Sequence, residues 1–201
     1  MNLKKAVRTV VACSALAIAS HANAATLKLS NGVLNSATGV DVGGVMYNVF
    51  FGDATCNYVF NGCSASTFAF SNGKDAILAA QALLDQVFID GPVFHFDSQT
   101  NNSYGCSNAV NCYSLIPYGK TGSLVNLAFA LNNAVGDDIA AKNFDPSQPT
   151  VDYSKIDNVQ FAFFYLAPTP PAVPAVVPEP GSLALMGLAF GALAYLRRRK
   201  A

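Results

Sequence analysis

The chain has 201 residues, and its 12 Lys and Arg balance its 12 Asp and Glu, so the formal net charge is zero. The charges are unevenly placed, because seven of the 12 basic residues lie in the first ten or the last five positions. Residues 25–166 hold five Lys, eleven Asp and no Arg, which gives this part a net charge of −6. This part of the chain, which we call the body, lacks the basic surface that neutralises a phosphate backbone. Nucleic acid is therefore not expected as a partner.

Residues 1–24 have the three parts of a secretory signal peptide. A short basic stretch precedes a mostly apolar run at 10–19, and the small residues Ala22 and Ala24 suit a signal peptidase. We therefore expect cleavage between Ala24 and Ala25. A membrane-spanning helix is the alternative, but the apolar run is much shorter than the roughly 20 residues that a span requires.

Four cysteines follow the expected cleavage point, as two close pairs: Cys56 with Cys63, and Cys106 with Cys112. An even number of cysteines in an exported chain predicts disulfides. Three connectivities exist, and the local one is favoured because a short loop already holds each pair together. Zinc is the alternative, but the spacings are not CxxC, and His95 is far from both pairs in sequence. We expect no metal and no cofactor.

Short apolar runs separated by turn signals predict a β-rich body. The expected strands are residues 26–29, 45–51, 67–70, 93–96, 113–116, 123–131 and 158–166. In the second of these, alternate side chains are expected to share one face, and they are Val45, Tyr47, Val49 and Phe51. His95 falls in the fourth run, where an exposed or hydrogen-bonded imidazole is the usual outcome.

One helix is expected, at residues 74–88, with Asn72 as its cap. The apolar residues that recur at helical spacing are Ile77, Ala80, Leu84 and Val87. Gly91-Pro92 cannot continue the helix. The predicted fold class is therefore α+β: a single β-rich domain over residues 25–166, with an antiparallel sheet or sandwich and this one main helix.

The C-terminal tail has four parts in a fixed order. A Pro-rich stretch at 167–177 favours an extended spacer. The segment Pro178-Glu179-Pro180-Gly181-Ser182 comes next, and an apolar run follows at 183–196. The chain then has a basic cluster of Arg197, Arg198, Arg199 and Lys200. The apolar run predicts a short C-terminal membrane helix, and the basic cluster would stay on the cytoplasmic side, which leaves the body outside.

This order of elements resembles the PEP-CTERM sorting signal. The resemblance implies recognition by a membrane-embedded exosortase, with processing near Pro178, Glu179 and Pro180. It also implies a Gram-negative host, often one that makes exopolysaccharide and biofilm matrix. The body, at residues 39–47 and at the Cys56/Cys63 pair, is similar to other PEP-CTERM cargo domains without an assigned activity. That likeness brings no catalytic residues with it.

The sequence of the body contains no recognisable nucleophile with a base, carboxylate pair or metal cluster. Asp97–Asn102 and Asp137-Asp138 offer oxygen ligands for calcium, but neither has the spacing of an EF-hand, and turn chemistry accounts for both. We therefore expect a non-enzymatic protein of the cell surface or extracellular matrix, which its C-terminal helix anchors transiently in the inner membrane with the body outside the cytoplasm. Its expected partners are signal peptidase, exosortase, and exopolysaccharide or other matrix proteins.

Two alternative functions stay open. A carbohydrate-binding or adhesive module of the biofilm matrix would expose Tyr and Phe side chains near polar loops. A secreted hydrolase would need His95, or two Asp residues, to converge in a cleft.

Overall fold

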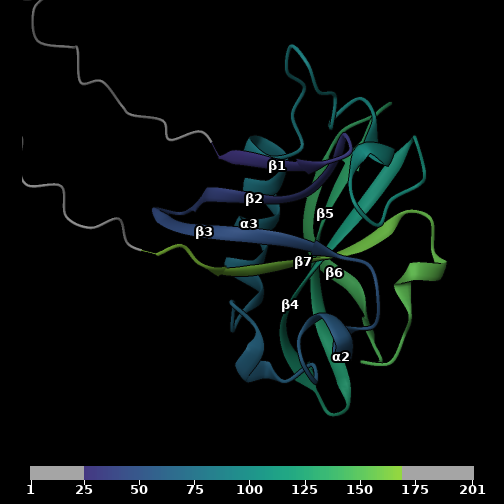
Figure 1. Cartoon of the computed structure of the whole chain (residues 1–201). Coiled ribbons are helices and arrows are strands. Elements are labelled where there is room, and N and C mark those ends of the chain that lie inside the picture. Colours follow the sequence, from purple (N-terminus) through teal and green to yellow (C-terminus); the bar gives the residue numbers. More distant parts are fainter. Residues whose placement is uncertain (1–24, 169–201) are drawn as a thin grey trace, which may run out of the picture. The chain divides into compact units, whose positions relative to one another are not determined.

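The computed structural model describes residues 25–168, and these are organised on a mixed seven-stranded sheet (Figure 1). The strands are β1 (Thr26–Ser30), β2 (Val33–Val42), β3 (Val45–Gly52), β4 (Asn111–Thr121), β5 (Leu124–Asn133), β6 (Ile139–Ser147) and β7 (Val159–Leu166). Their order in the sheet is β1-β2-β3-β7-β4-β5-β6. Neighbours are antiparallel except β7 and β4, which are parallel. The last strand in the sequence therefore joins the first three strands to the next three.

The helices are α2 (Cys56–Val59) and α3 (Gly73–Gln86), with short 3-10 helices at η1 (Ala65–Thr67), η2 (Thr100–Asn102) and η3 (Tyr153–Lys155). The side chain of Asn72 caps α3, because its Oδ1 accepts from the backbone N–H of Asp75 at 3.0 Å. At the other end the amide of Gln86 bonds to both backbone groups of Asp41 on β2, at 2.9 and 2.8 Å. Both ends of α3 are thus fixed by side-chain hydrogen bonds.

Apolar side chains pack on both faces of the sheet. One cluster lies between α3 and the sheet, and a second lies on the opposite face, around α2 and η3. Strand β7 contributes to both, because Ala162 and Phe164 belong to the first cluster while Val159 and Phe161 belong to the second. A strand buried on both faces is expected to be almost entirely apolar, and the sequence of β7 is apolar except for Gln160.

The structure confirms the β-rich class, the main helix and five of the expected strands. Residues 74–88 correspond to α3, and the predicted strands correspond to β1, β3, β4, β5 and β7, of which β4 is much longer than expected. Tyr47, Val49 and Phe51 share the face that packs toward α3. Val45, which was expected on the same face, is exposed at the start of β3.

Two expected strands are wrong. Residues 67–70 pair with no strand in the described part of the chain, and Phe70 instead packs against the ring of Tyr47, with ring centroids 5.3 Å apart. Residues 93–96 form a turn in which the N–H of Gly91 donates to the carbonyl of Phe94 at 2.8 Å. The rings of Phe94 and Phe96 stack with their centroids 5.2 Å apart. The alternating aromatic residues that suggested a strand therefore pack against each other within a turn.

Strands β2 and β6 were not expected from the sequence. The register of β2 against β3 shifts between Ala37 and Val40, and Gly39 in this bulge has φ +74°. A second shift, in the pairing with β1, lies between Leu34 and Ser36. The two shifts break the period of two, so the buried residues Leu34, Ala37 and Val40 recur every third position. Strand β6 is an edge strand with an irregular register against β5 and a Pro near its end, which is tolerated at an edge.

We predict that two neighbouring residues of β3 differ sharply in their contribution to stability. Phe51 is 0% exposed and its ring lies 5.5 Å from that of Phe88, whereas Phe50 on the other face is 49% exposed. Phe51→Ala should lower the free energy of unfolding by about 3–5 kcal/mol, and Phe50→Ala by less than about 1 kcal/mol. Urea denaturation measures both. Equal losses would contradict the assignment of the two faces.

Candidate functional site

A pocket lies on the face of the sheet opposite α3, where β3 and β7 pair. Four aromatic residues line it, Phe50, Tyr58, Tyr104 and Phe163, and we call it the aromatic pocket. Its volume of about 300 Å³ is within the range of small-ligand sites. Tyr58 is 83% exposed and Tyr104 is 43% exposed. Exposed rings that cluster in this way make the pocket a candidate for contact with a ligand or partner.

The sheet supplies two of the four rings. Phe50 and Phe163 are direct partners in the register of β3 and β7, so their side chains lie on the same face. Along β7, alternate residues form a row from the core to the surface, because Phe161 is buried and Tyr165 is 46% exposed. Phe163 lies between them, with its ring 6.1 Å from that of Tyr165. The pocket is therefore continuous with the packed interior.

The third ring comes from a loop closed by the Cys56–Cys63 disulfide, whose Cα atoms are 5.3 Å apart. Both cysteines are buried, and the loop between them contains α2 with Tyr58 and Val59. A Cβ atom on Gly52 would lie 2.9 Å from the side chain of Val59. Only glycine at this position lets the loop lie directly on β3, which brings Tyr58 to the pocket.

The fourth ring, Tyr104, lies two residues before the Cys106–Cys112 disulfide, whose Cα atoms are 5.9 Å apart. The backbone N–H of Tyr104 donates to the carbonyl of Leu34 on β2 at 2.9 Å. The two local disulfides that the spacing predicted are thus present, and each one holds a segment that gives the pocket one tyrosine.

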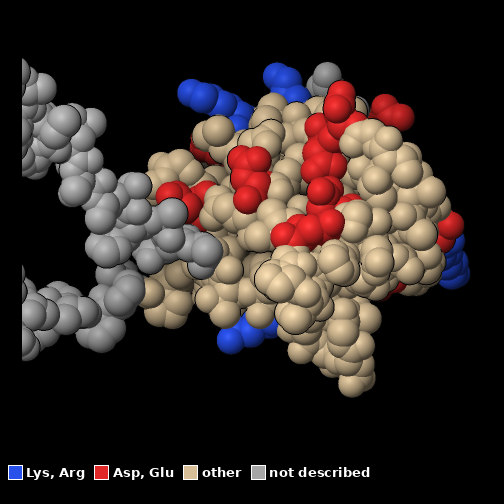
Figure 2. Space-filling model, turned by 90° about the horizontal axis from the view of Figure 1, so that it is seen from above, with Lys and Arg blue, Asp and Glu red and all other residues tan. Residues whose placement is uncertain are grey.

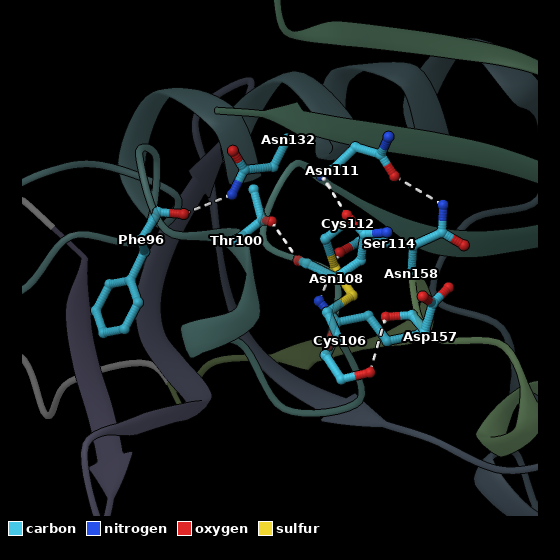
Figure 3. Close-up of a disulfide and its surroundings, with 12 residues drawn as sticks. Phe96, Thr100, Cys106, Asn108, Asn111, Cys112, Ser114, Asn132, Asp157 and Asn158 are labelled. Carbon is cyan, nitrogen blue, oxygen red and sulfur yellow. Dashed lines mark hydrogen bonds between the residues drawn. A yellow bond between two sulfur atoms is a disulfide. The ribbon is translucent and has the colours of Figure 1, made fainter. Parts of the chain in front are cut away.

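Polar side chains fix the segment around Cys106–Cys112, as Figure 3 shows. The hydroxyl of Thr100 donates to the carbonyl of Asn108 at 2.7 Å, and the amide of Asn158 donates to Asn111 Oδ1 at 2.7 Å. Asn132, fully buried on β5, donates to the carbonyl of Phe96 at 2.6 Å. The Asn-rich composition of this region therefore supplies a hydrogen-bonded framework around the Cys106–Cys112 disulfide.

Asp53, directly after β3, is the one carboxylate among the residues that line the aromatic pocket. Its Oδ1 atom is buried and has no hydrogen-bond partner among the described residues. Gly105 has φ +85°, and a Cβ atom there would lie 2.8 Å from the Cβ of Asp53 and 3.0 Å from that of Gln160. Glycine is therefore required for the Tyr104 segment to pass so close to Asp53.

Burial raises the pKa of Asp53, and the charge of Asp152 raises it further. Asp152 caps η3, and its hydrogen bond from the hydroxyl of Ser154 lowers the pKa of Asp152. The ammonium of Lys155 lies 3.7 Å from Asp152, but this lysine is largely exposed. Positive charge next to Asp53 is thus scarce, and its ionised form is poorly compensated.

His95 lies in a different place from the pocket and forms an exposed pair with Asp90. Its Nδ1 atom is 3.8 Å from Asp90 Oδ2, and both side chains are more than one third exposed. This agrees with the expectation of an exposed imidazole. Neither residue lines the aromatic pocket.

Acidic side chains gather on the face that Figure 2 shows, with basic ones at its margins. Burial and the neighbouring Asp90 raise the pKa of Asp97, and burial also raises that of Asp138. Asp138 Oδ1 accepts a hydrogen bond from the backbone N–H of Asn133 at 2.8 Å, as Asp side chains commonly do in turns. Within residues 25–168, no three His, Cys, Asp or Glu side chains are arranged to hold a metal ion.

Several predicted site residues lie outside the described part of the chain. These are Ala22 and Ala24 before the expected cleavage, the motif at 178–180, and the basic cluster at 197–200. The expected C-terminal membrane helix also lies outside it. Among residues 25–168, no helix combines the length and the apolar character that a membrane span needs.

The aromatic pocket itself was not predicted from the sequence. Part of the signal was present, because Tyr58 lies inside one cysteine loop and Tyr104 lies next to the other. The remaining rings could not be placed, since Phe50 and Phe163 are 113 positions apart and meet only through the pairing of β3 with β7. The dipeptide Gly52-Asp53 has the composition of an ordinary turn, so nothing in the sequence distinguishes Asp53.

Comparison with known proteins finds a match in the tail. Residues 176–200 match the family model of the PEP-CTERM protein-sorting motif. No curated protein and no solved structure matches the chain.

We predict that Asp53→Asn stabilises the fold at neutral pH. The pKa of Asp53 is higher in the folded state than in the unfolded state, so its ionised form costs stability, and the cost disappears as the pH falls through the folded pKa. Thermal melts should show a Tm gain of up to about 3 °C at pH 7, shrinking toward pH 4. Asp145→Asn, at an exposed carboxylate of β6, is the control and should leave Tm unchanged. A gain that is equal at all pH values would contradict the explanation.

Proposed function

We propose that this PEP-CTERM domain-containing protein is exported by its N-terminal signal peptide and sorted by an exosortase at its tail, and that it acts at the cell surface or in the extracellular matrix as a non-enzymatic domain. The observation that carries the proposal is the sorting motif at residues 176–200. The motif accounts for the Pro-Glu-Pro segment, the apolar run and the terminal basic cluster together. A signal peptide at 1–24 supplies the export step that such a tail requires.

The properties of the body support this route. Disulfides form in oxidising compartments outside the cytoplasm, and both cysteine pairs of the body are bonded. The composition of residues 167–177 favours an extended spacer between the body and the membrane. Such a spacer would hold the folded domain away from the membrane.

A carbohydrate-binding or adhesive module is the second candidate, and the aromatic pocket favours it. Exposed Tyr and Phe side chains lie beside polar loops that are held by disulfides, which is the arrangement expected for such a module. A hydrolase has less support. Asp53 has Asp152 as a charged neighbour, but Asp152 caps η3 and does not line the pocket. The two carboxylates are therefore not presented to one cleft.

Intact-mass analysis and localisation in the host, with and without its exosortase, test the sorting route. We expect a mature chain that begins at Ala25 and that loses its C-terminus near residues 178–180 only when the exosortase is present. A chain that keeps residues 197–200 in both strains would show that the tail is an ordinary membrane anchor.

Substitution of the motif should have the same effect as loss of the enzyme. Glu179→Ala removes the one acidic group of the tail, and the variant should keep its C-terminus and remain in the membrane fraction. Thr169→Ala, in the Pro-rich spacer, is the control and should be processed like the wild type. Normal processing of the Glu179→Ala variant would show that cleavage does not depend on the motif.

A further inference from the structure

The aromatic pocket combines rings with a negative charge that lacks a partner. Its lining contains four aromatic residues and Asp53, and within the described residues no Lys or Arg belongs to it. The Oδ1 atom of Asp53 is buried without a hydrogen bond. This oxygen is closed to solvent and therefore to a ligand donor, but Asp53 belongs to the lining, so a cation in the pocket would lie close to its carboxylate and offset the negative charge.

The rings around Asp53 favour the same kind of ligand. The face of an aromatic ring carries the negative part of its quadrupole, so several rings around one cavity attract a cation that is weakly hydrated. Phe50 and Phe163 approach the cavity from the sheet, while Tyr58 and Tyr104 approach it from the two disulfide-held segments. Rings from four separate segments can contact a rounded alkyl-ammonium group on several sides.

We propose that the aromatic pocket binds ligands through an ammonium group, with the four rings contacting the group and its substituents and Asp53 offsetting its charge. The proposal concerns the ligand of the folded body and does not depend on how the tail is processed. Two sources share this chemistry: a quaternary ammonium head such as that of choline, and the protonated amine of an amino sugar. The pocket volume of about 300 Å³ accommodates either group.

Other ligand classes fit the pocket less well. A neutral sugar could donate hydroxyl hydrogens to Asp53 but would leave its charge uncompensated. An acidic sugar would meet Asp53 and the nearby Asp152, and both are negative when ionised. The net charge of the whole body, −6 over residues 25–166, also attracts cations over longer distances.

The two disulfides prepare the pocket before a ligand arrives. Cys56–Cys63 closes the loop of Tyr58, and Cys106–Cys112 fixes the segment of Tyr104. Because these segments are already ordered, little conformational entropy is lost when the rings contact a ligand. This order before binding is what allows a small pocket on exposed loops to bind a single headgroup.

The test is calorimetric titration of the full-length exported protein, kept in detergent, with choline and with glucosamine. Each cation has a neutral isostere, 3,3-dimethylbutan-1-ol for choline and glucose for glucosamine. We expect at least one cation to bind about tenfold or more tightly than its isostere. The cation that binds more tightly identifies the source of the ammonium group. Equal binding of glucose and glucosamine would indicate a neutral-carbohydrate site, and no binding of either cation would exclude the proposed site. Either result overturns the proposal.

Matched variants separate loss of the site from loss of the fold. Asp53→Asn should weaken binding of the cation at least about tenfold while leaving the protein folded. Tyr58→Ala, at a ring that packs little in the free protein, should weaken it similarly. The controls are Asp145→Asn and Tyr165→Ala, which change an exposed carboxylate and an exposed ring outside the pocket lining. Unchanged affinity in Asp53→Asn, with folding verified by circular dichroism, would overturn the proposal.

Discussion

The pairing of β7 between β3 and β4 is the interaction on which the rest of the structure depends. β7 is antiparallel to β3 over six residue pairs and parallel to β4 over three, so it joins two sets of strands that have no other connection in the order of the sheet. Its apolar residues enter the clusters on both faces. The buried amide of Gln160 also donates to Ser114 on β4 at 2.8 Å, which ties the short parallel pairing together. Without β7 neither α3 nor α2 would have a complete surface to pack on.

The aromatic pocket follows from this central position. Phe163 is brought beside Phe50 by the register of β7 with β3, and the two disulfide-held segments then lie over the same face. Asp53 and Gly105 meet because the Tyr104 segment is bonded to β2 on one side and to the Cys106–Cys112 disulfide on the other. The same backbone constraints thus set the shape of the cavity and the unfavourable environment of its carboxylate. The ionised carboxylate of Asp53 lowers the stability of the fold, and a cationic ligand would need that same charge. A loss of stability of this kind is common at functional sites.

The sequence predicted the features that local patterns determine. α3 was found because its apolar positions repeat at helical spacing and Asn72 caps it, and both disulfides were found because each pair is close in sequence. The failures come from tertiary context. The bulge at Gly39 hid β2, and the stacked rings of Phe94 and Phe96 imitated a strand. The aromatic pocket was missed because its residues come from four segments. No local pattern shows that Phe50 and Phe163 are neighbours, or that one carboxylate oxygen of Asp53 is buried.

The position of β7 also determines how the domain carries mechanical load. The strand ends at Leu166, directly before the Pro-rich spacer, and the same strand lines the aromatic pocket through Phe163. A pull on the chain beyond Leu166 therefore enters the sheet at its central strand. A force along β7 first loads its antiparallel hydrogen bonds to β3, which reach Leu166, in shear rather than opening them one after another from an edge. Tension applied at this end is transmitted through the middle of the sheet, and the edge strands β1 and β6 carry little of it.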